Sequence, residues 1–514
     1  MKKLTGFLFL LFAFSHVAVA DWPQWRGPLR NGVIPNATGV PAELTDANEP
    51  TKVWESQEVP SDHYGGHGSV AVANGKVFVS VVWHRDEPTE TRRIDNKVMS
   101  DLGYRGYEKL GEELIAKMED QRMNLSRRLR GAALDEFSDQ WVKENLNEKD
   151  AMSLGGWIAS RFKKGKTAIP LSVFATLKEV RTQEFANQAE MEVWVKEQKF
   201  DPSIEAQIIA AVPDTKKVAN DVVLCLDAET GDEVWKFEQP GSPSGRGSSS
   251  TPAILDGKVY AALSNHLYCV DEKTGEKVWE TPLQRKGPAS SPLVANGKVF
   301  LQQNNLTAYN AETGEVAWEN KEARGVNQSP AVWKGIVICN AAKEVVGVNG
   351  ETGETMWKAP GGGDGTPVVS GDHLVITSKT DDKNLIAYDL SPEGVTEKWS
   401  IGFLSRRYGS SPIIYDGNVY HLGSERHMCV DLENGKIQWE RKAQSSISSP
   451  FIADGKLFVY ENRGGFISMI QATPEDYTPL GRAKVGALYC ASPAFVDGKL
   501  YFRTKDRVTC YALQ

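Results

Sequence analysis

The 514-residue chain has no apolar run beyond its first 20 residues that is long enough to cross a bilayer. It also has no excess of positive charge, since 59 Lys and Arg stand against 67 Asp and Glu, a formal net charge of −8 at pH 7. Nucleic-acid-binding domains carry a basic patch or stripe. The composition therefore predicts neither a transmembrane segment nor a nucleic-acid partner.

Cysteine is scarce, and no two of the six cysteines are adjacent. The chain contains no Cys-x-x-Cys-His haem motif and no paired cysteine spacing of the kind that binds zinc. Four cysteines occupy a repeated position that takes Ala, Gly or Ser elsewhere in the chain: Cys225, Cys269, Cys429 and Cys510. We expect these four to be small buried hydrophobic residues, in preference to disulfides or metal ligands.

Residues 1–20 have the features of a secretory signal peptide. Lys2 and Lys3 precede the apolar stretch Leu4–Phe14, and Ala18-Val19-Ala20 resembles a small-residue cleavage site. The pattern predicts export to the periplasm or secretion after cleavage near Ala20. Separately, we expect the exported protein to be a monomer. No cysteine follows that site, so no lipid-attachment signal is expected.

A fragment of the form Asp-x-x-Thr-Gly-x-x-x-Trp recurs about every 40 residues, with Asn replacing Asp in some copies and Asn434 replacing Thr in the last one. The copies are Asp227–Trp235, Asp271–Trp279, Asn310–Trp318, Asn349–Trp357, a stretched copy at Asp389–Trp399, and Asp431–Trp439. Each is followed by a Ser/Thr-Pro step, a short apolar run and a turn such as Asp256-Gly257. Repeats of this length with β content are typical of propeller blades, each a four-stranded sheet.

Eight inner strands are predicted, with first residues Val70, Pro252, Pro292, Pro330, Pro367, Pro412, Pro450 and Pro493. The eighth blade ends after its third strand, and Thr51–Glu55 is a candidate for the missing fourth. Such a closure removes two open sheet edges. We expect the repeated tryptophans to dock neighbouring blades against each other: Trp54, Trp235, Trp279, Trp318, Trp357, Trp399 and Trp439.

The blade motif resembles the pyrroloquinoline-quinone (PQQ) repeat of quinoprotein dehydrogenases and of the outer-membrane β-barrel assembly lipoprotein. The opening Asp21–Pro28 (DWPQWRGP) resembles the start of many exported PQQ-like repeat proteins of planctomycete-type bacteria. The resemblance implies an all-β, eight-bladed propeller. It implies no single activity, because the shared motif joins the blades and carries no chemistry.

A helical insertion is expected within the first blade. We divide the chain into an arm (21–50), a propeller (51–84 and 221–514) and the insertion (85–220). Apolar spacing predicts helices over Tyr107–Met118, Asp135–Asn145 and Met191–Lys199, with a further helix beginning at Pro202. No catalytic or ligand motif occurs in the insertion, so it is either structural or a docking element for a partner.

Two groups of residues are candidates for binding sites. Basic residues precede four inner strands at equivalent positions, and together they form a predicted collar for an anionic ligand: Arg246, Lys286, Arg324, Arg406 and Arg407. The alternative is that they are ordinary solvated side chains. Asp62, His63 and His67, on a Gly-rich loop, are candidate metal ligands or ordinary turn residues.

No catalytic residue is predicted. The Ser-x-Asp-x-Gly-x-x-Trp box of sialidases is absent, which argues against a glycosidase propeller. The first functional hypothesis is an exported, non-enzymatic binding or scaffolding platform for protein or glycan partners. The alternative is a quinoprotein oxidoreductase, for which PQQ and Ca²⁺ would be the cofactors.

Overall fold

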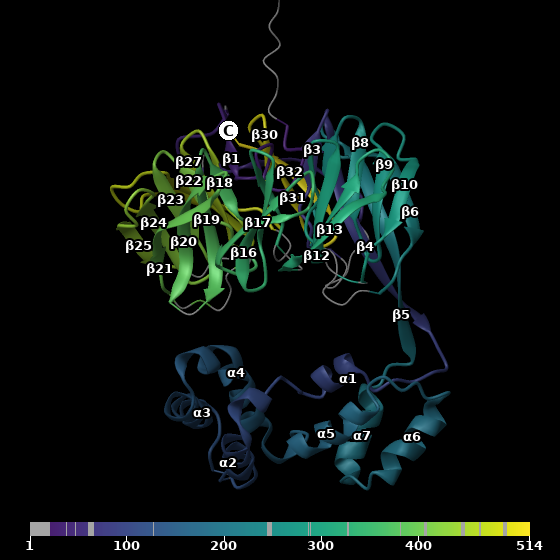
Figure 1. The fold of residues 1–514 in the computed structure, drawn as a ribbon. Helices are drawn as coiled ribbons and strands as arrows, with labels where there is room; N and C mark the ends of the chain where they lie inside the picture. The colour runs from purple at the N-terminus through teal and green to yellow at the C-terminus, as the bar shows by residue number, and fades with distance from the viewer. Residues whose placement is uncertain are drawn as a thin grey trace, which may run out of the picture.

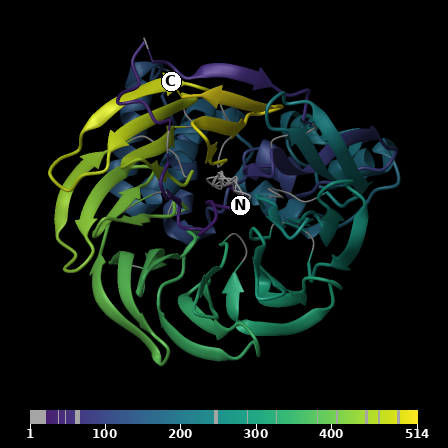
Figure 2. The same cartoon turned by 90° about the horizontal axis from the view of Figure 1, so that it is seen from above.

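The computed structural model describes residues 21–513 apart from 38, 47, 60–65, 127, 244–248, 286, 288, 326–327, 381, 404, 406–408, 444–447, 462–463 and 487–490. The strands of these residues form eight separate sheets, and Figures 1 and 2 show them as a ring around a central axis. The predicted all-β propeller class is confirmed. We refer to the sheets as blades 1 to 8 in chain order of their inner strands.

The blades are composed as follows. Blade 1 is β3 (Ala71–Ala73), β4 (Lys76–Pro88), β5 (Thr215–Asp227) and β6 (Glu233–Pro240); blade 2 is β7 (Ala253–Leu255), β8 (Lys258–Ala262), β9 (His266–Asp271) and β10 (Lys277–Pro282). Blade 3 is β11 (Leu293–Ala295), β12 (Lys298–Asn310) and β13 (Val316–Gly325); blade 4 is β14 (Ala331–Trp333), β15 (Ile336–Asn340), β16 (Glu344–Asn349) and β17 (Thr355–Pro360). Blade 5 is β18 (Val368–Ser370), β19 (His373–Thr380), β20 (Lys383–Ser391) and β21 (Gly394–Ile401); blade 6 is β22 (Ile413–Tyr415), β23 (Asn418–Leu422), β24 (Arg426–Asp431) and β25 (Ile437–Lys442). Blade 7 is β26 (Phe451–Ala453), β27 (Lys456–Glu461), β28 (Phe466–Gln471) and β29 (Pro479–Lys484), with β1 (Val33–Ile34) added; blade 8 is β30 (Ala494–Val496), β31 (Lys499–Arg503), β32 (Val508–Ala512) and β2 (Thr51–Glu55).

The hairpin between the first two strands of a blade is set by a two-residue turn. Asp256 and Gly257 both have positive φ, 49° and 72°. These values are typical of a type I′ turn, which matches the twist of the flanking strands. Equivalent pairs, such as Asn74-Gly75 and Asp497-Gly498, have the same signs of φ.

The repeated motif joins each blade to the next. In the first full copy, the Asp227 carboxylate accepts hydrogen bonds from the backbone N–H groups of Glu229 and Thr230 and so fixes the turn. Gly231 then approaches the Trp54 ring so closely that a Cβ atom would lie 2.4 Å from it. The indole N–H of Trp54 donates to the Ala228 carbonyl (3.0 Å).

The same contact recurs around the ring. The indole N–H groups of Trp235, Trp279, Trp318, Trp399 and Trp439 donate to backbone carbonyls of the following blade at 2.8–3.2 Å. The Trp357 N–H is buried without an acceptor. Trp357 faces blade 5, which carries the stretched copy of the motif. There Leu390 lies inside β20 and pairs with Val395, so the turn whose carbonyl accepts the indole hydrogen bond in the other blades does not form.

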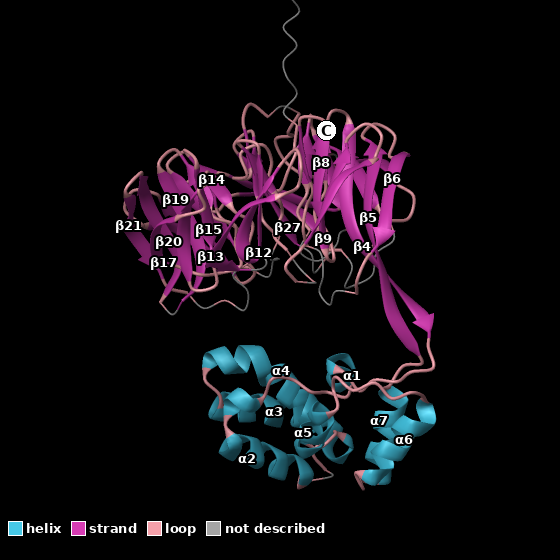
Figure 3. Ribbon diagram, turned by 45° about the vertical axis from the view of Figure 1, so that its right-hand side comes forward, coloured by secondary structure: helices cyan, strands magenta, loops and turns pink. Residues whose placement is uncertain are grey.

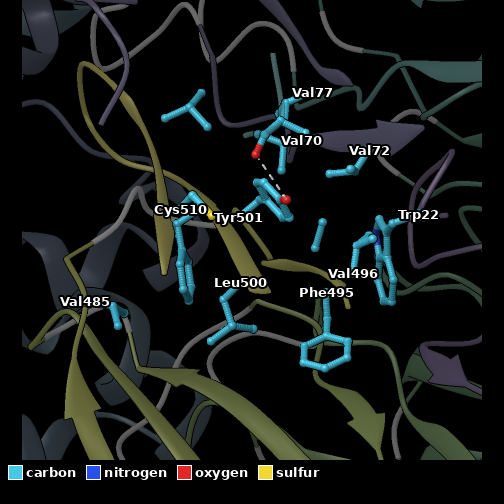
Figure 4. Close-up of a cluster of buried hydrophobic side chains, with 14 of the residues drawn as sticks. Trp22, Val70, Val72, Val77, Val485, Phe495, Val496, Leu500, Tyr501 and Cys510 are labelled. Carbon is cyan, nitrogen blue, oxygen red and sulfur yellow. Dashed lines mark hydrogen bonds between the residues drawn. The ribbon is translucent and has the colours of Figure 1, made fainter. Parts of the chain in front are cut away.

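The ring is closed between blades 7, 8 and 1. Strand β2 pairs antiparallel with β32, so that Trp54 lies opposite Cys510. Figure 4 shows side chains from the N-terminal arm and from these blades packed into one cluster, including Trp22, Val72, Phe495 and Tyr501. Burial of this cluster is what holds the two ends of the chain together.

The described cysteines are free and buried, namely Cys225, Cys269, Cys339, Cys429 and Cys510. Burial raises the pKa of the Cys225 thiol to about 12 and that of Cys510 to about 11. Both therefore remain neutral thiols at physiological pH. The prediction that the four repeated cysteines are small buried residues is confirmed.

Helices lie between β4 and β5, below the propeller in Figures 1 and 3. They are α1 (Asn96–Asp101), η1 (Glu108–Leu110), α2 (Glu112–Met123), α3 (Ala132–Asn145), α4 (Glu148–Lys164), η2 (Gly165–Thr167), α5 (Leu171–Glu179), α6 (Gln188–Glu197) and α7 (Pro202–Ala211). We call residues 89–214 the helical subdomain. Its hydrophobic core contains only residues between Ile94 and Val212, so it is separate from the propeller core. No helix in the described part of the chain has both the length and the apolar character that crossing a membrane requires.

Three details differ from the expectations. Blade 3 has three strands and not four, because the single long strand β12 pairs with β11 through its first residues and with β13 through its last ones. The prediction of one helix over Tyr107–Met118 is wrong, because Gly111, with φ of 79°, separates η1 from α2. The strands that lead to the subdomain also continue beyond residues 84 and 221, since β4 and β5 remain paired as far as Pro88 and Thr215. The start of α7 at Pro202 agrees with the prediction, and the Asp201 carboxylate caps it through the Ser203 N–H (2.8 Å).

Candidate functional site: the channel plug and the hydroxyl ring

One Ser or Thr from each blade, the residue before or at the start of the inner strand, lies close to the axis. We call this set the hydroxyl ring: Ser69, Thr251, Ser291, Ser329, Thr366, Ser411, Ser449 and Ser492. At seven of the eight links between these residues, the backbone N–H of one member donates to the hydroxyl oxygen of the next at 2.8–3.1 Å. At the remaining link, the Thr366 hydroxyl accepts from the Trp25 indole N–H (2.9 Å). The ring thus satisfies backbone donors that would otherwise be buried without partners.

Residues 21–34 of the arm, which we call the plug, lie against this ring. Trp22 and Val72 exchange two backbone hydrogen bonds of 2.8 Å. The Pro23 carbonyl accepts from the Ile254 N–H (2.8 Å), and β1 pairs in parallel with β26 of blade 7. The plug therefore contacts inner strands of blades 1, 2 and 7.

Two arginines of the plug reach the other side of the ring. Arg30 donates from Nε to the Pro330 carbonyl (3.0 Å) and from Nη1 to the Pro292 carbonyl (2.8 Å). Arg26 donates from Nη2 to the carbonyls of Pro412 (2.7 Å) and Asn31 (3.0 Å). The plug thereby cross-links blades 3, 4 and 6 through charge-assisted hydrogen bonds, which are stronger than neutral ones.

Both guanidinium groups are buried, with 2% of Arg26 and 3% of Arg30 exposed. Burial lowers the pKa of each to about 9, and for Arg26 the charge of Arg30 contributes further. Both groups therefore still carry their charge at neutral pH. The hydrogen-bond acceptors of both groups are carbonyl and amide oxygens, so no carboxylate in the described residues neutralises either charge.

A second layer of buried polar groups lies at the far ends of the second strands. Arg503 of β31 is 1% exposed and donates from Nη1 to the Ser80 carbonyl (3.3 Å), while its Nε and Nη2 have no partner. Burial lowers its pKa to about 10. Tyr460 and Gln302, at the equivalent position of blades 7 and 3, each also have a buried polar atom without a partner.

Sequence reasoning missed the plug arginines and Arg503. Arg26 and Arg30 lie in a short segment rich in Gly, Pro and Trp. The sequence of this segment resembles the start of exported PQQ-like repeat proteins, but it contains no motif that assigns a role to either arginine. Arg503 directly follows three apolar or aromatic residues in a strand pattern, Leu500 to Phe502, and a cation at a predicted buried position is the signal that would have found it.

Most of the predicted collar lies outside the described residues: Arg246, Lys286, Arg406 and Arg407. Arg324 is described and lies at the end of β13. It is exposed, and its Nη2 donates to the Asn304 side chain (3.1 Å). The collar therefore remains a prediction.

Asp62 and His63 of the candidate metal site are also outside the described residues. His67 is described and is buried, with 5% exposed. Within the described ranges, no three His, Cys, Asp or Glu side chains are grouped so that they would hold a metal ion. A PQQ site with Ca²⁺ needs oxygen ligands for the ion and cations for the PQQ carboxylates. The described residues do not fit this pair of cofactors, because they supply buried cations without the acidic ligands.

A cavity of about 700 Å³ lies where the helical subdomain joins blade 1. Its lining includes Asp86, Thr215 and Lys217 of the paired strands, residues of α1, and Pro243 of the segment that leads to β7. Because Pro243 precedes the inner strand β7, the helices lie on the face of the propeller that carries the loops leading into the inner strands. Several charges of the lining are already paired: Arg93 with Glu184 (2.7 Å), Lys97 with Asp101 (2.6 Å) and Lys217 with Asp86 (3.1 Å).

The fold and the repeat define the class as a PQQ-like repeat propeller. A family model described as "Outer membrane protein assembly factor BamB" matches residues 219–402 and 404–476, half of the chain. The chain belongs to this family of PQQ-like repeat propellers. The plug and the helical subdomain lie outside the matched residues.

Known proteins similar to the chain include the outer membrane protein assembly factor BamB of Yersinia pestis, 24% identical over 259 residues, which are 48% of this chain and 58% of that protein. The chain thus matches little more than half of the length of that relative. Similar solved structures are BamB from Moraxella catarrhalis (16% identity, TM-score 0.47, 57% of this chain and 89% of that one) and the quinohemoprotein alcohol dehydrogenase ADHIIG from Pseudomonas putida HK5 (16%, 0.40, 58% and 72%).

Proposed function

We propose that the protein is an exported, non-enzymatic binding platform that holds a protein partner between its helical subdomain and the adjacent face of the propeller. The observation that carries this proposal is the way in which the subdomain is attached. Family membership supports the same class, because the similar proteins are named as assembly factors. The predicted signal peptide supports a location in the periplasm or outside the cell.

The subdomain is held away from the propeller by a two-stranded ribbon (Figure 3). β4 and β5 are paired from Lys76 and Asp227 to Pro88 and Thr215, but β6 pairs with β5 only from Asn220 onwards. Five residue pairs therefore extend beyond the blade. At about 3.3 Å per residue, they hold the helices roughly 16 Å from the end of the sheet.

Specific contacts stiffen the base of this ribbon. The guanidinium of Arg85 lies 4.8 Å from the centre of the Trp83 ring, and the Lys236 ammonium lies 5.4 Å from it. Cation–π contacts of this kind are worth about 0.5–1 kcal/mol at exposed sites. A ribbon that is fixed at its base and paired along its length is suited to present a separate folded unit to a partner.

The cavity where the helical subdomain joins blade 1 has a lining suited to contact with a protein surface. Its lining holds acidic and basic side chains in equal number, and three pairs of them form salt bridges, so the cavity has no excess of one charge. Mixed polar surfaces without excess charge are typical of non-obligate protein interfaces. The subdomain also exposes Val193 (56%) and Met123 (42%), which provide apolar contact area.

The test compares the full chain with a ribbon-closed variant, in which Asn-Gly replaces residues 89–214 and joins Pro88 to Thr215. These two residues are directly paired, and Asn-Gly is a favoured type I′ turn, so the variant should fold as a propeller with one long hairpin. Tagged versions of both proteins are cross-linked in an extract of the cell envelope. The expected result is a protein partner that cross-links to the helices of the full chain and is lost from a cooperatively melting variant.

Two results would overturn the proposal. One is equal capture of the partner by the ribbon-closed variant. The other is turnover of an alcohol or sugar with a redox dye by the full chain loaded with PQQ and Ca²⁺, which would establish the quinoprotein alternative.

A further inference from the structure

Arg26 of the plug has an incomplete set of hydrogen-bond partners in a fully buried position. Its Nη2 is satisfied by two carbonyls, but its Nε and Nη1 have no partner. A guanidinium has five N–H donors. A buried charged donor left without an acceptor is costly, at about 1–3 kcal/mol or more for each group. The site therefore requires an acceptor that is not a residue of the described chain.

A small cavity lies beside these atoms. Arg26, Trp22 and Trp25 line it from the plug, and Ser69, Ser449 and Ser492 of the hydroxyl ring line it from blades 1, 7 and 8. The cavity has a volume of about 10 Å³. A space of this size holds roughly one water molecule or one monatomic ion, and it is too small for sulfate or phosphate.

The three serines of the cavity can each offer a further donor. Each hydroxyl oxygen accepts a backbone N–H of the neighbouring ring member, at 2.8 Å for Ser69, 3.1 Å for Ser449 and 2.9 Å for Ser492. None of these bonds uses the hydrogen of the hydroxyl group itself. Those hydrogens can rotate toward the cavity, where Nε and Nη1 of Arg26 are also available.

From this arrangement we propose that the cavity is a binding site for one halide-sized monovalent anion, chloride under physiological conditions. Two adjacent buried guanidinium groups carry two positive charges, and their hydrogen bonds go only to neutral oxygens. Buried charges in proteins are normally paired. A chloride ion accepts from Arg26 and from the serine hydroxyls and neutralises one charge, whereas a water molecule supplies acceptors but no charge.

The first experiment locates the ion in the intact protein. Crystals of the full chain are grown or soaked in sodium bromide, and anomalous scattering is recorded at the bromine edge. The expected result is an anomalous peak on the axis, beside Nε and Nη1 of Arg26 and the Ser492 hydroxyl. A well-ordered cavity without such a peak means that water fills it, and the proposal is then refuted.

The second experiment measures the linkage to stability. The melting temperature of the wild type should rise with chloride concentration above the rise seen in sodium gluconate of equal ionic strength, since a ligand of the native state stabilises it by mass action. Arg26→Met should abolish this chloride-specific increment. Arg30→Met is the matched control, because every nitrogen of the Arg30 guanidinium already has an oxygen acceptor and Arg30 does not line the cavity. Loss of its charge weakens the anion site but leaves the donors in place, so this variant should keep a measurable chloride-specific increment even though its absolute stability falls.

The readout is the chloride-specific increment, so general destabilisation by either substitution does not affect it. An increment that is equal in wild type and Arg26→Met contradicts the proposal, as does a wild type that melts alike in chloride and gluconate. If Arg26→Met fails to fold, the bromide experiment on the wild type decides the question.

Discussion

The two tryptophans Trp357 and Trp399 provide a matched test of how the blades are joined. Both are 8% exposed and occupy the same position of the repeat. The Trp399 N–H donates to the buried Leu432 carbonyl (2.8 Å), whereas the Trp357 N–H has no acceptor. Substitution of each by Phe removes a similar volume of ring but a hydrogen bond from only one of them.

The expected difference follows from the fate of the carbonyl. In Trp399→Phe, the Leu432 oxygen stays buried without a donor, which costs about 1–3 kcal/mol in addition to the lost packing. In Trp357→Phe, the substitution removes an N–H that was already unsatisfied, so its desolvation penalty disappears. Trp399→Phe should therefore lower the free energy of unfolding by roughly 1–3 kcal/mol more than Trp357→Phe.

The assay is equilibrium unfolding in urea, followed by circular dichroism and by tryptophan fluorescence. If the two probes coincide for all three proteins, the midpoints at a common slope give the difference in free energy. Equal costs for the two substitutions, within about 0.5 kcal/mol, would contradict the reasoning. They would mean that the indole hydrogen bond contributes nothing and that ring packing alone joins the blades.

Three further predictions concern other parts of the propeller. Removal of residues 21–55 should lower the melting temperature much more than removal of residues 21–44, because only the longer deletion removes β2 and exposes the edge of β32. In Arg30→Met, three carbonyls of the inner strands lose their donor, so the variant should unfold at a urea concentration clearly below that of the wild type; an unchanged midpoint would show that the plug adds no stability. Burial lowers the pKa of His421 to about 3 and that of His427 to about 4. Because the unfolded chain takes up these protons near pH 6.5 and the native state does not, the free energy of unfolding should fall as pH drops from about 6.5 toward 4, and His421→Gln should make this fall less steep.

The local chemistry of the repeat was sufficient to predict the propeller. Asp227, Gly231 and Trp235 act within one turn or on the next blade, so their spacing encodes the turn, the close approach and the docking contact. The same spacing predicted that the last blade would take its fourth strand from the N-terminus, and β2 pairs with β32. The stretched copy at Asp389 was visible in the sequence as well, but its consequence for Trp357 was not, because that contact depends on the strand register of blade 5.

Only the tertiary structure decided the role of the arm. Arg26 and Arg30 bind blade carbonyls that lie 261 to 386 residues away along the chain, and the ring brings these together only when it closes. No periodicity links an arginine in a Gly- and Pro-rich segment to a proline carbonyl in a distant repeat. A repeat specifies contacts between neighbours, whereas the centre of a propeller is shared by all blades at once. The residues that fill this centre are therefore identified from the closed ring and not from the repeat.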